Sequence, residues 1–260
     1  MKTFKSTACA AAFLAFGATA TNAAPINLVQ NGGFETTSVT HSSPLALTGA
    51  LTQSVVADWQ VWAPGGYNYS LVYFPGEATT TGALGISNGL NPNPAVLWAA
   101  ADSPDGGNFI AIDGDSTVTN VLSQTIHGLT VGQQYDLSFD YAGAQFNVRD
   151  GATTEGWLVG FGAAQQTTTV LSNANHGFTG WFKSEMQFTA TSTDQLLSFM
   201  AKGTPDGFPP VSLIDGVSLT EVPKVAEVPE PASIALMALG LIGLGVSRRS
   251  QRTSKAASAV

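Results

Sequence analysis

Short runs of alternating polar and apolar residues, separated by turns rich in Gly and Pro, constrain the fold of this chain most. In the run 135–141, Tyr, Leu, Phe and Tyr occupy the odd positions, and Asp, Ser and Asp the even ones. A period of two is typical of a strand with one buried face. Comparable strand candidates lie at 108–113, 156–161 and 195–200, and turn signals such as Asp105-Gly106-Gly107 and Pro205-Asp206-Gly207 punctuate the body. We therefore predict an all-β fold, an antiparallel β-sandwich.

The charge of the chain is low and unevenly distributed. Charged residues make up 11% of the sequence, and the part between the two ends holds four basic residues against 18 acidic ones, a net charge of −14. Nucleic-acid binding depends on Lys and Arg side chains that neutralise phosphates. This composition excludes DNA and RNA as partners.

The first 23 residues have the layout of a secretory signal peptide. Lys2 and Lys5 precede an apolar run over 8–18 and a stretch of small residues that ends at Ala23. This order predicts export and cleavage after Ala23. The single cysteine, Cys9, lies inside the signal peptide, so the mature protein is expected to hold no disulfide and no thiolate metal site.

The C-terminal segment has three parts in a fixed order. The peptide Val228-Pro229-Glu230-Pro231 follows a predicted linker at 221–228 and precedes a single apolar helix at about 232–247, after which come Arg248 and Arg249. The apolar run is shorter than the roughly 20 residues of an ordinary spanning helix, so it would cross a bilayer only marginally. The arginines predict a cytoplasmic C-terminus.

This order at 229–252 resembles the PEP-CTERM sorting signal of exported Gram-negative proteins. The resemblance implies a transient stay in the inner membrane and processing near Pro229-Glu230-Pro231 by an exosortase-type enzyme. It also implies a final place at the cell surface or in the extracellular matrix. An ordinary C-terminal membrane anchor is the alternative.

The body at 24–220 resembles galactose-binding-like jelly rolls, to which carbohydrate-binding modules belong. The resemblance rests on the segments 27–35, 105–109, 123–135 and 213–219. It implies a jelly-roll sandwich and a structural Ca²⁺ between the first and last strands. The matching residues are Glu35 and Asp215. No other cofactor is expected.

The residues around Asp215 leave two interpretations open. Asp215 shares the phase of Val211, Leu213, Val217 and Leu219, so a continuous strand would place a carboxylate on an apolar face. A buried charge is costly unless it is paired or bound to a metal. The alternative is an Asp-Gly hairpin turn with Asp215 at its tip.

Aromatic residues gather in the first half of the body, where a glycan-binding patch is predicted. Trp59 and Trp62 would point to opposite faces of a strand, so at most one of them can be buried. Tyr67 and Tyr69 share one face of an extended segment, and the Asn68 amide can both donate and accept hydrogen bonds. The predicted glycan contacts are Trp62, Tyr67, Asn68 and Tyr69. Trp157 and Trp181 are assigned to the core.

No catalytic arrangement is apparent in the sequence. The G-x-S-x-G match at 85–89 is followed by two prolines instead of a helix, which the hydrolase motif requires. The three histidines share no metal-ligand spacing and are expected at the surface. We therefore expect a non-enzymatic surface or matrix protein that binds a glycan or exopolysaccharide. The alternatives are a secreted hydrolase of polysaccharide or protein, and a purely structural component of a biofilm matrix.

Overall fold

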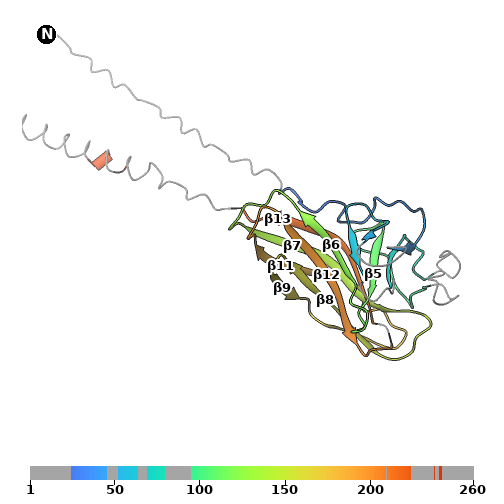
Figure 1. Ribbon diagram of the computed structural model, residues 1–260. Coiled ribbons are helices and arrows are strands. Elements are labelled where there is room, and N and C mark those ends of the chain that lie inside the picture. The colour runs from blue at the N-terminus through green and yellow to red at the C-terminus, as the bar shows by residue number, and fades with distance from the viewer. Residues whose placement is uncertain are drawn as a thin grey trace, which may run out of the picture. The chain divides into compact units, whose positions relative to one another are not determined.

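The computed structural model describes residues 25–45, 52–63, 69–79, 95–208, 210–223, 237, 240 and 241 (Figure 1). The predicted signal peptide and nearly all of the predicted C-terminal helix lie outside these residues, although 237, 240 and 241 are helical. Among the described residues, no helix is both long and apolar enough to cross a membrane. The chain divides into two units, 1–222 and 223–260.

The first unit is built from strands packed in two layers (Figure 1). In chain order they are β1 (Ser43–Pro44), β2 (Thr52–Gln53), β3 (Gln60–Trp62), β4 (Ser70–Tyr73), β5 (Phe109–Asp113), β6 (Val121–Ile126), β7 (Gln134–Gln145), β8 (Thr153–Phe161), β9 (Ala164–Thr167), β10 (Leu171–Asn173), β11 (Phe182–Thr189), β12 (Gln195–Thr204) and β13 (Pro210–Glu221).

The strands form two antiparallel sheets, which confirms the predicted β-sandwich. One sheet has six strands in the order β1-β4-β5-β13-β7-β11. The other has seven, in the order β10-β8-β12-β6-β3-β2, with β9 paired to β8. Many neighbouring strands are distant in the chain: β13, for example, lies between β5 and β7. The segments predicted as strands at 108–113, 135–141, 156–161 and 195–200 fall in β5, β7, β8 and β12.

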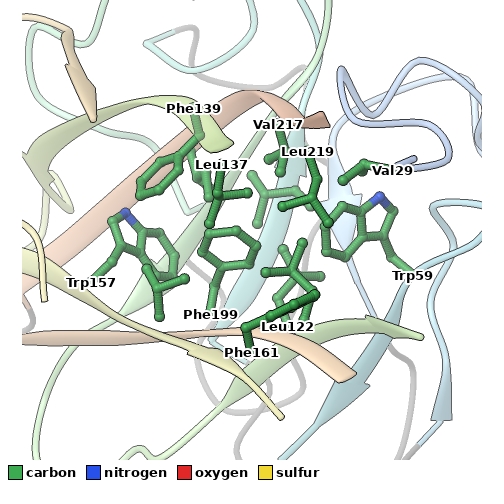
Figure 2. Close-up of a cluster of buried hydrophobic side chains, with 14 of the residues drawn as sticks. Val29, Trp59, Leu122, Leu137, Phe139, Trp157, Phe161, Phe199, Val217 and Leu219 are labelled. Atoms are coloured by element: carbon green, nitrogen blue, oxygen red, sulfur yellow. The ribbon is translucent and has the colours of Figure 1, made fainter. Parts of the chain in front are cut away.

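A large cluster of hydrophobic side chains, many of them aromatic, fills the space between the two sheets (Figure 2). Phe199 contacts Trp157 edge-on at 6.2 Å between ring centroids, and Phe139 edge-on at 5.2 Å. The indole N–H of Trp157 donates to the Leu213 carbonyl at 3.1 Å, so this buried donor is satisfied. Trp157 lies in the core as predicted.

A second apolar cluster lies on the opposite face of the six-stranded sheet. It includes Tyr73, Phe109 and Leu213, and Trp181 packs against it. Trp181 is half-buried, with its ring edge-on to Phe109 at 5.5 Å and its indole N–H donating to the Ala101 carbonyl. This tryptophan, which we assigned to the core, therefore belongs to the cluster outside the sandwich interior.

The segment 27–35, the first of those that carry the jelly-roll resemblance, runs beside β13 without forming a regular strand. The Leu28 amide donates to the Leu219 carbonyl, and the Val217 amide donates to the Gly32 carbonyl, both at 2.9 Å. The Asn27 side chain accepts from the Leu219 amide as well. These bonds occupy the side of β13 that β5 leaves free, because β5 pairs only with residues 211–214.

A β-bulge interrupts β13 next to Asp215. The pairing with β7 shifts between Asp215 and Ser218, and Gly216 has a φ of 60°, which glycine adopts without strain. Before the bulge, Leu213 faces the second cluster; after it, Val217 and Leu219 face the sandwich core (Figure 2). The hairpin interpretation is therefore wrong, because Asp215 lies within a strand. The phase it was expected to share with Val217 and Leu219 is lost at the bulge.

Candidate functional site

Four carboxylates gather where the bulge of β13 faces β7 and two loops. Asp215 on β13 pairs directly with Asp140 on β7. A methyl group added at Gly33 would lie 3.7 Å from Asp105 Oδ2 and 4.0 Å from Asp215 Oδ1, with the Glu35 side chain also at 4.0 Å. We call Glu35, Asp105, Asp140 and Asp215 the acidic cluster. The structure thus brings the predicted pair Glu35 and Asp215 together and adds two partners that the sequence analysis missed.

Asp215 is the buried member of the acidic cluster. Its side chain is 0% exposed, and within the described part of the chain neither carboxylate oxygen has a hydrogen-bond partner. The pKa of Asp215 is raised to about 7, mainly by burial, and the nearby carboxylates of Asp105 and Glu35 contribute to this rise. The Ser103 hydroxyl and the Gly216 amide oppose this rise without reaching good hydrogen-bond geometry.

Two of the other members, Asp140 and Glu35, have contacts of their own. Asp140 Oδ1 lies 3.4 Å from the Lys183 ammonium. Glu35 Oε1 accepts a hydrogen bond from the Asn108 amide at 2.6 Å, which ties the loop after the first segment to the start of β5. A side chain at Gly107 would collide with the Glu35 carboxylate. In the described residues, no three carboxylate or imidazole groups are arranged closely enough to hold a metal ion as they stand.

A fifth carboxylate, Glu155, is buried at another place. It lies on β8, points into the sandwich toward Gly143 of β7, and is 0% exposed. Neither of its carboxylate oxygens has a hydrogen-bond partner among the described residues. Burial raises the pKa of Glu155 to about 7, although the nearby Thr153 hydroxyl lowers it in part. Nothing in the sequence marks this group, since Glu155 lies in an ordinary alternating run.

The predicted glycan contacts do not all lie on one surface. Trp59 is fully buried whereas Trp62 is 42% exposed, which confirms that the two rings point in opposite directions. Trp62 ends β3 in the seven-stranded sheet, but Tyr69 precedes β4 in the six-stranded sheet and is half-buried. Tyr67 and Asn68 lie outside the described residues, as does the G-x-S-x-G match at 85–89.

The three histidines each pair with a carboxylate from another loop. His41 Nδ1 lies 2.9 Å from Glu77, His127 pairs with Asp194, and His176 pairs with Asp150. His41 and His127 are exposed, as predicted, and His176 is half-buried because its ring stacks on Trp98 at 4.2 Å. These pairs connect surface loops to one another.

The comparison with protein families identifies the C-terminal segment. Residues 227–249 match the PEP-CTERM protein-sorting motif. The chain carries a PEP-CTERM sorting signal. The matched range includes the peptide Val228-Pro229-Glu230-Pro231 and the pair Arg248-Arg249. The signal indicates an exported protein that is held transiently in the membrane and processed by an exosortase.

No curated protein matches the chain. Its solved structural neighbours include carbohydrate-binding modules. TmCBM61, determined in complex with β-1,4-galactotriose, is 15% identical, with 76% of this chain and 99% of that chain covered and a TM-score of 0.41. The CBM22-1 xylan-binding domain of Xyn10C from Paenibacillus barcinonensis is 11% identical, with 78% and 98% covered and a TM-score of 0.36.

The PEP-CTERM signal leads to a prediction about processing. Replacing Pro229-Glu230-Pro231 by three alanines is expected to leave the protein in the inner membrane, because the processing enzyme no longer recognises it. Cell fractionation locates the variant, and the intact mass of the secreted wild-type protein measures the cut. A secreted mass that still includes Arg248 and Arg249 would contradict the prediction.

Proposed function

We propose that this chain is a non-enzymatic surface or matrix protein whose β-sandwich binds a glycan, such as an exopolysaccharide outside the cell. The PEP-CTERM signal delivers the protein to the compartment where such a polymer lies. The observation that carries the proposal is the position of Trp62. Its indole stands 42% exposed on the outward face of a sheet, while Trp59, three residues earlier, is in the core.

An exposed indole on a rigid strand is well suited to sugar binding. Its flat apolar face can stack on the apolar face of a sugar ring, and two side-chain torsions fix its orientation at low entropic cost. Trp62 is held in place because its neighbour Val61 is fully buried in the core. In this proposal Trp62 is the anchor, and Tyr67 and Asn68 on the segment that follows it are further contacts. Tyr69 is left out of the proposed site, because it precedes a strand of the other sheet.

We further propose that the acidic cluster holds a structural Ca²⁺. Calcium prefers six to eight oxygen ligands, which here would come from Asp215, Asp105 and Glu35 together with carbonyl groups and water. The supporting observation is the buried Asp215 carboxylate without a hydrogen-bond partner. A bound cation would offset the repulsion between these carboxylates and fasten the N-terminal segment to β13. Its role would be structural.

The glycan proposal predicts the effect of truncating the anchor. Trp62→Ala is expected to weaken glycan binding at least tenfold, about 1.4 kcal/mol, because the stacking surface is lost. The melting temperature should stay unchanged, since the indole is not part of the core. Glycan-array screening followed by calorimetric titration measures the affinity.

The matched control is Phe182→Ala, which removes a similarly exposed ring from the other sheet. Equal affinities for Trp62→Ala and the wild type would remove Trp62 from the site. A hydrolysis screen on the same polysaccharides separates binding from catalysis. Turnover that a carboxylate substitution abolishes would favour the alternative of a secreted hydrolase.

A further inference from the structure

Resting on the proposed glycan binding, we propose that the ligand is an uncharged, linear polysaccharide. It lies across strands β3, β6, β12 and β8 on the outward face of the seven-stranded sheet. The strand registers of this sheet place the residues of the proposed site side by side on that face.

A row of apolar side chains crosses these four strands from Trp62. In the register of the sheet, Trp62 pairs with Val121, Val121 with Met200, and Met200 with Leu158. All four side chains point away from the core, because alternate side chains of a strand face opposite sides and the adjacent residues face inward. Those inward neighbours, Val61, Leu122, Phe199 and Trp157, belong to the core cluster. We call Trp62, Val121, Met200 and Leu158 the apolar row.

The apolar row is long enough for an extended chain. Neighbouring strands lie about 4.8 Å apart, so four strands give a row of about 14 Å. Trp62 is exposed, and Val121, Met200 and Leu158 are half-buried, so each presents part of its surface to solvent. A surface of this length fits an oligosaccharide segment better than a single sugar.

A row of uncharged polar residues runs parallel to the apolar row. Two positions along each strand, Gln60 pairs with Ser123, Ser123 with Ser198, and Ser198 with Gly160. A side chain at Gly160 would lie only 2.6 Å from Ser198 Oγ, so the absence of a side chain there leaves room for the serine hydroxyl. Amide and hydroxyl groups can both donate to and accept from sugar hydroxyls. Gln60 is exposed and Ser198 is half-buried, whereas Ser123 is buried, so Gln60 and Ser198 are the members of this row that can bond a ligand beside the stacking surface.

The face that carries both rows has almost no charge. The outward residues of β3, β6, β8 and β12 include a single ionisable group, Lys202, although the chain holds 18 acidic residues. The outward face of the other sheet, by contrast, carries Asp136, Asp140 and Glu185. A polyanionic polysaccharide would find one cationic partner beside the rows, Lys202, and would be repelled by the acidic body. An uncharged polymer needs no cationic partners and is not repelled by the acidic body.

The test uses the secreted, processed protein and a panel of four polymers. Xylan and a β-glucan are uncharged, and alginate and polygalacturonate are anionic. Binding is measured by calorimetry and affinity electrophoresis at low and high salt. We expect binding to at least one uncharged polymer that does not change with salt, and no binding to the anionic ones. Binding to the polyuronates that weakens with salt would overturn the inference.

Variants far from Trp62 test the path of the chain. Met200→Glu is expected to weaken binding of the uncharged polymer at least tenfold, because it places a solvated charge in the middle of the apolar row. The matched control is Leu196→Glu on the same strand and face, two positions beyond the polar row, which should bind like the wild type. Leu158→Thr tests the far end without adding charge, and thermal melting checks that each variant is folded.

The outcomes separate this inference from the proposed function. Wild-type binding with equal affinities for Met200→Glu, Leu158→Thr and Leu196→Glu would overturn the path across the strands and leave glycan binding in place. A wild-type protein that binds no polysaccharide at all, in an array that includes charged and uncharged polymers, would overturn both.

Discussion

Stripping calcium from the secreted protein is expected to lower its melting temperature by about 10 °C. A ligand that binds only the native state at about 1,000 times its dissociation constant stabilises that state by about 4 kcal/mol. In a domain of this size, each kcal/mol shifts the melting temperature by about 2–4 °C. The ion would compensate the carboxylates of Asp215, Asp105 and Glu35, which otherwise meet without a balancing charge. Scanning calorimetry with calcium and with excess chelator measures the difference.

Substitutions identify where the ion binds. Asp215→Ala and Glu35→Ala are expected to melt at the same temperature with calcium and with chelator, because each removes a ligand. Asp194→Ala is the control, since Asp194 is an exposed carboxylate paired with His127 elsewhere on the surface. Wild-type protein that melts at one temperature before and after thorough metal removal would rule out the structural ion.

When the pH rises from 5 to 8, the free energy of unfolding of Glu155→Gln is expected to fall by up to about 3 kcal/mol less than that of the wild type. Burial raises the pKa of Glu155 from 4.5 to about 7 in the folded state. Between these values the unfolded chain releases the proton first, so the wild-type stability falls as pH rises from about 4.5 and is lowest above pH 7. Glutamine does not ionise, so the variant lacks the loss of stability that ionisation of Glu155 causes in the wild type.

Urea unfolding at pH 5 and pH 8 measures both free energies. Glu185→Gln is the matched control, because Glu185 is an exposed glutamate on β11. If the wild type and Glu155→Gln lose stability in parallel between the two pH values, then Glu155 does not titrate as a buried group with a raised pKa.

The local patterns of the sequence were enough for the fold class and the sorting signal. The alternation at 135–141 predicted β7, because a half-buried strand imposes a period of two on its own residues. The PEP-CTERM signal was likewise recognisable because its parts are contiguous in the chain.

Features that depend on pairing between distant segments were not predictable. Nothing local marks the bulge at Gly216, and Asp105 reads as a turn residue until the fold brings its loop to Asp215. Asp140 joins the acidic cluster only through the register of β7 with β13. Tyr69 and Trp62 are close in the chain, yet Trp62 ends β3 of the seven-stranded sheet and Tyr69 precedes β4 of the six-stranded sheet.

The hydrogen bonds around β13 have a mechanical consequence. The sorting tail continues directly from this strand, which lies inside its sheet with β7 along one side and β5 and then the N-terminal segment along the other. Within the described part of the chain, the bond nearest the tail runs from the Val222 amide to the Gln134 carbonyl. It precedes Pro229, so cutting near the signal breaks none of these bonds. A pull on an uncut tail would load the backbone bonds on both sides of β13 in shear, and many would have to break together. The body is thus attached through an inner strand rather than an edge strand that could peel away.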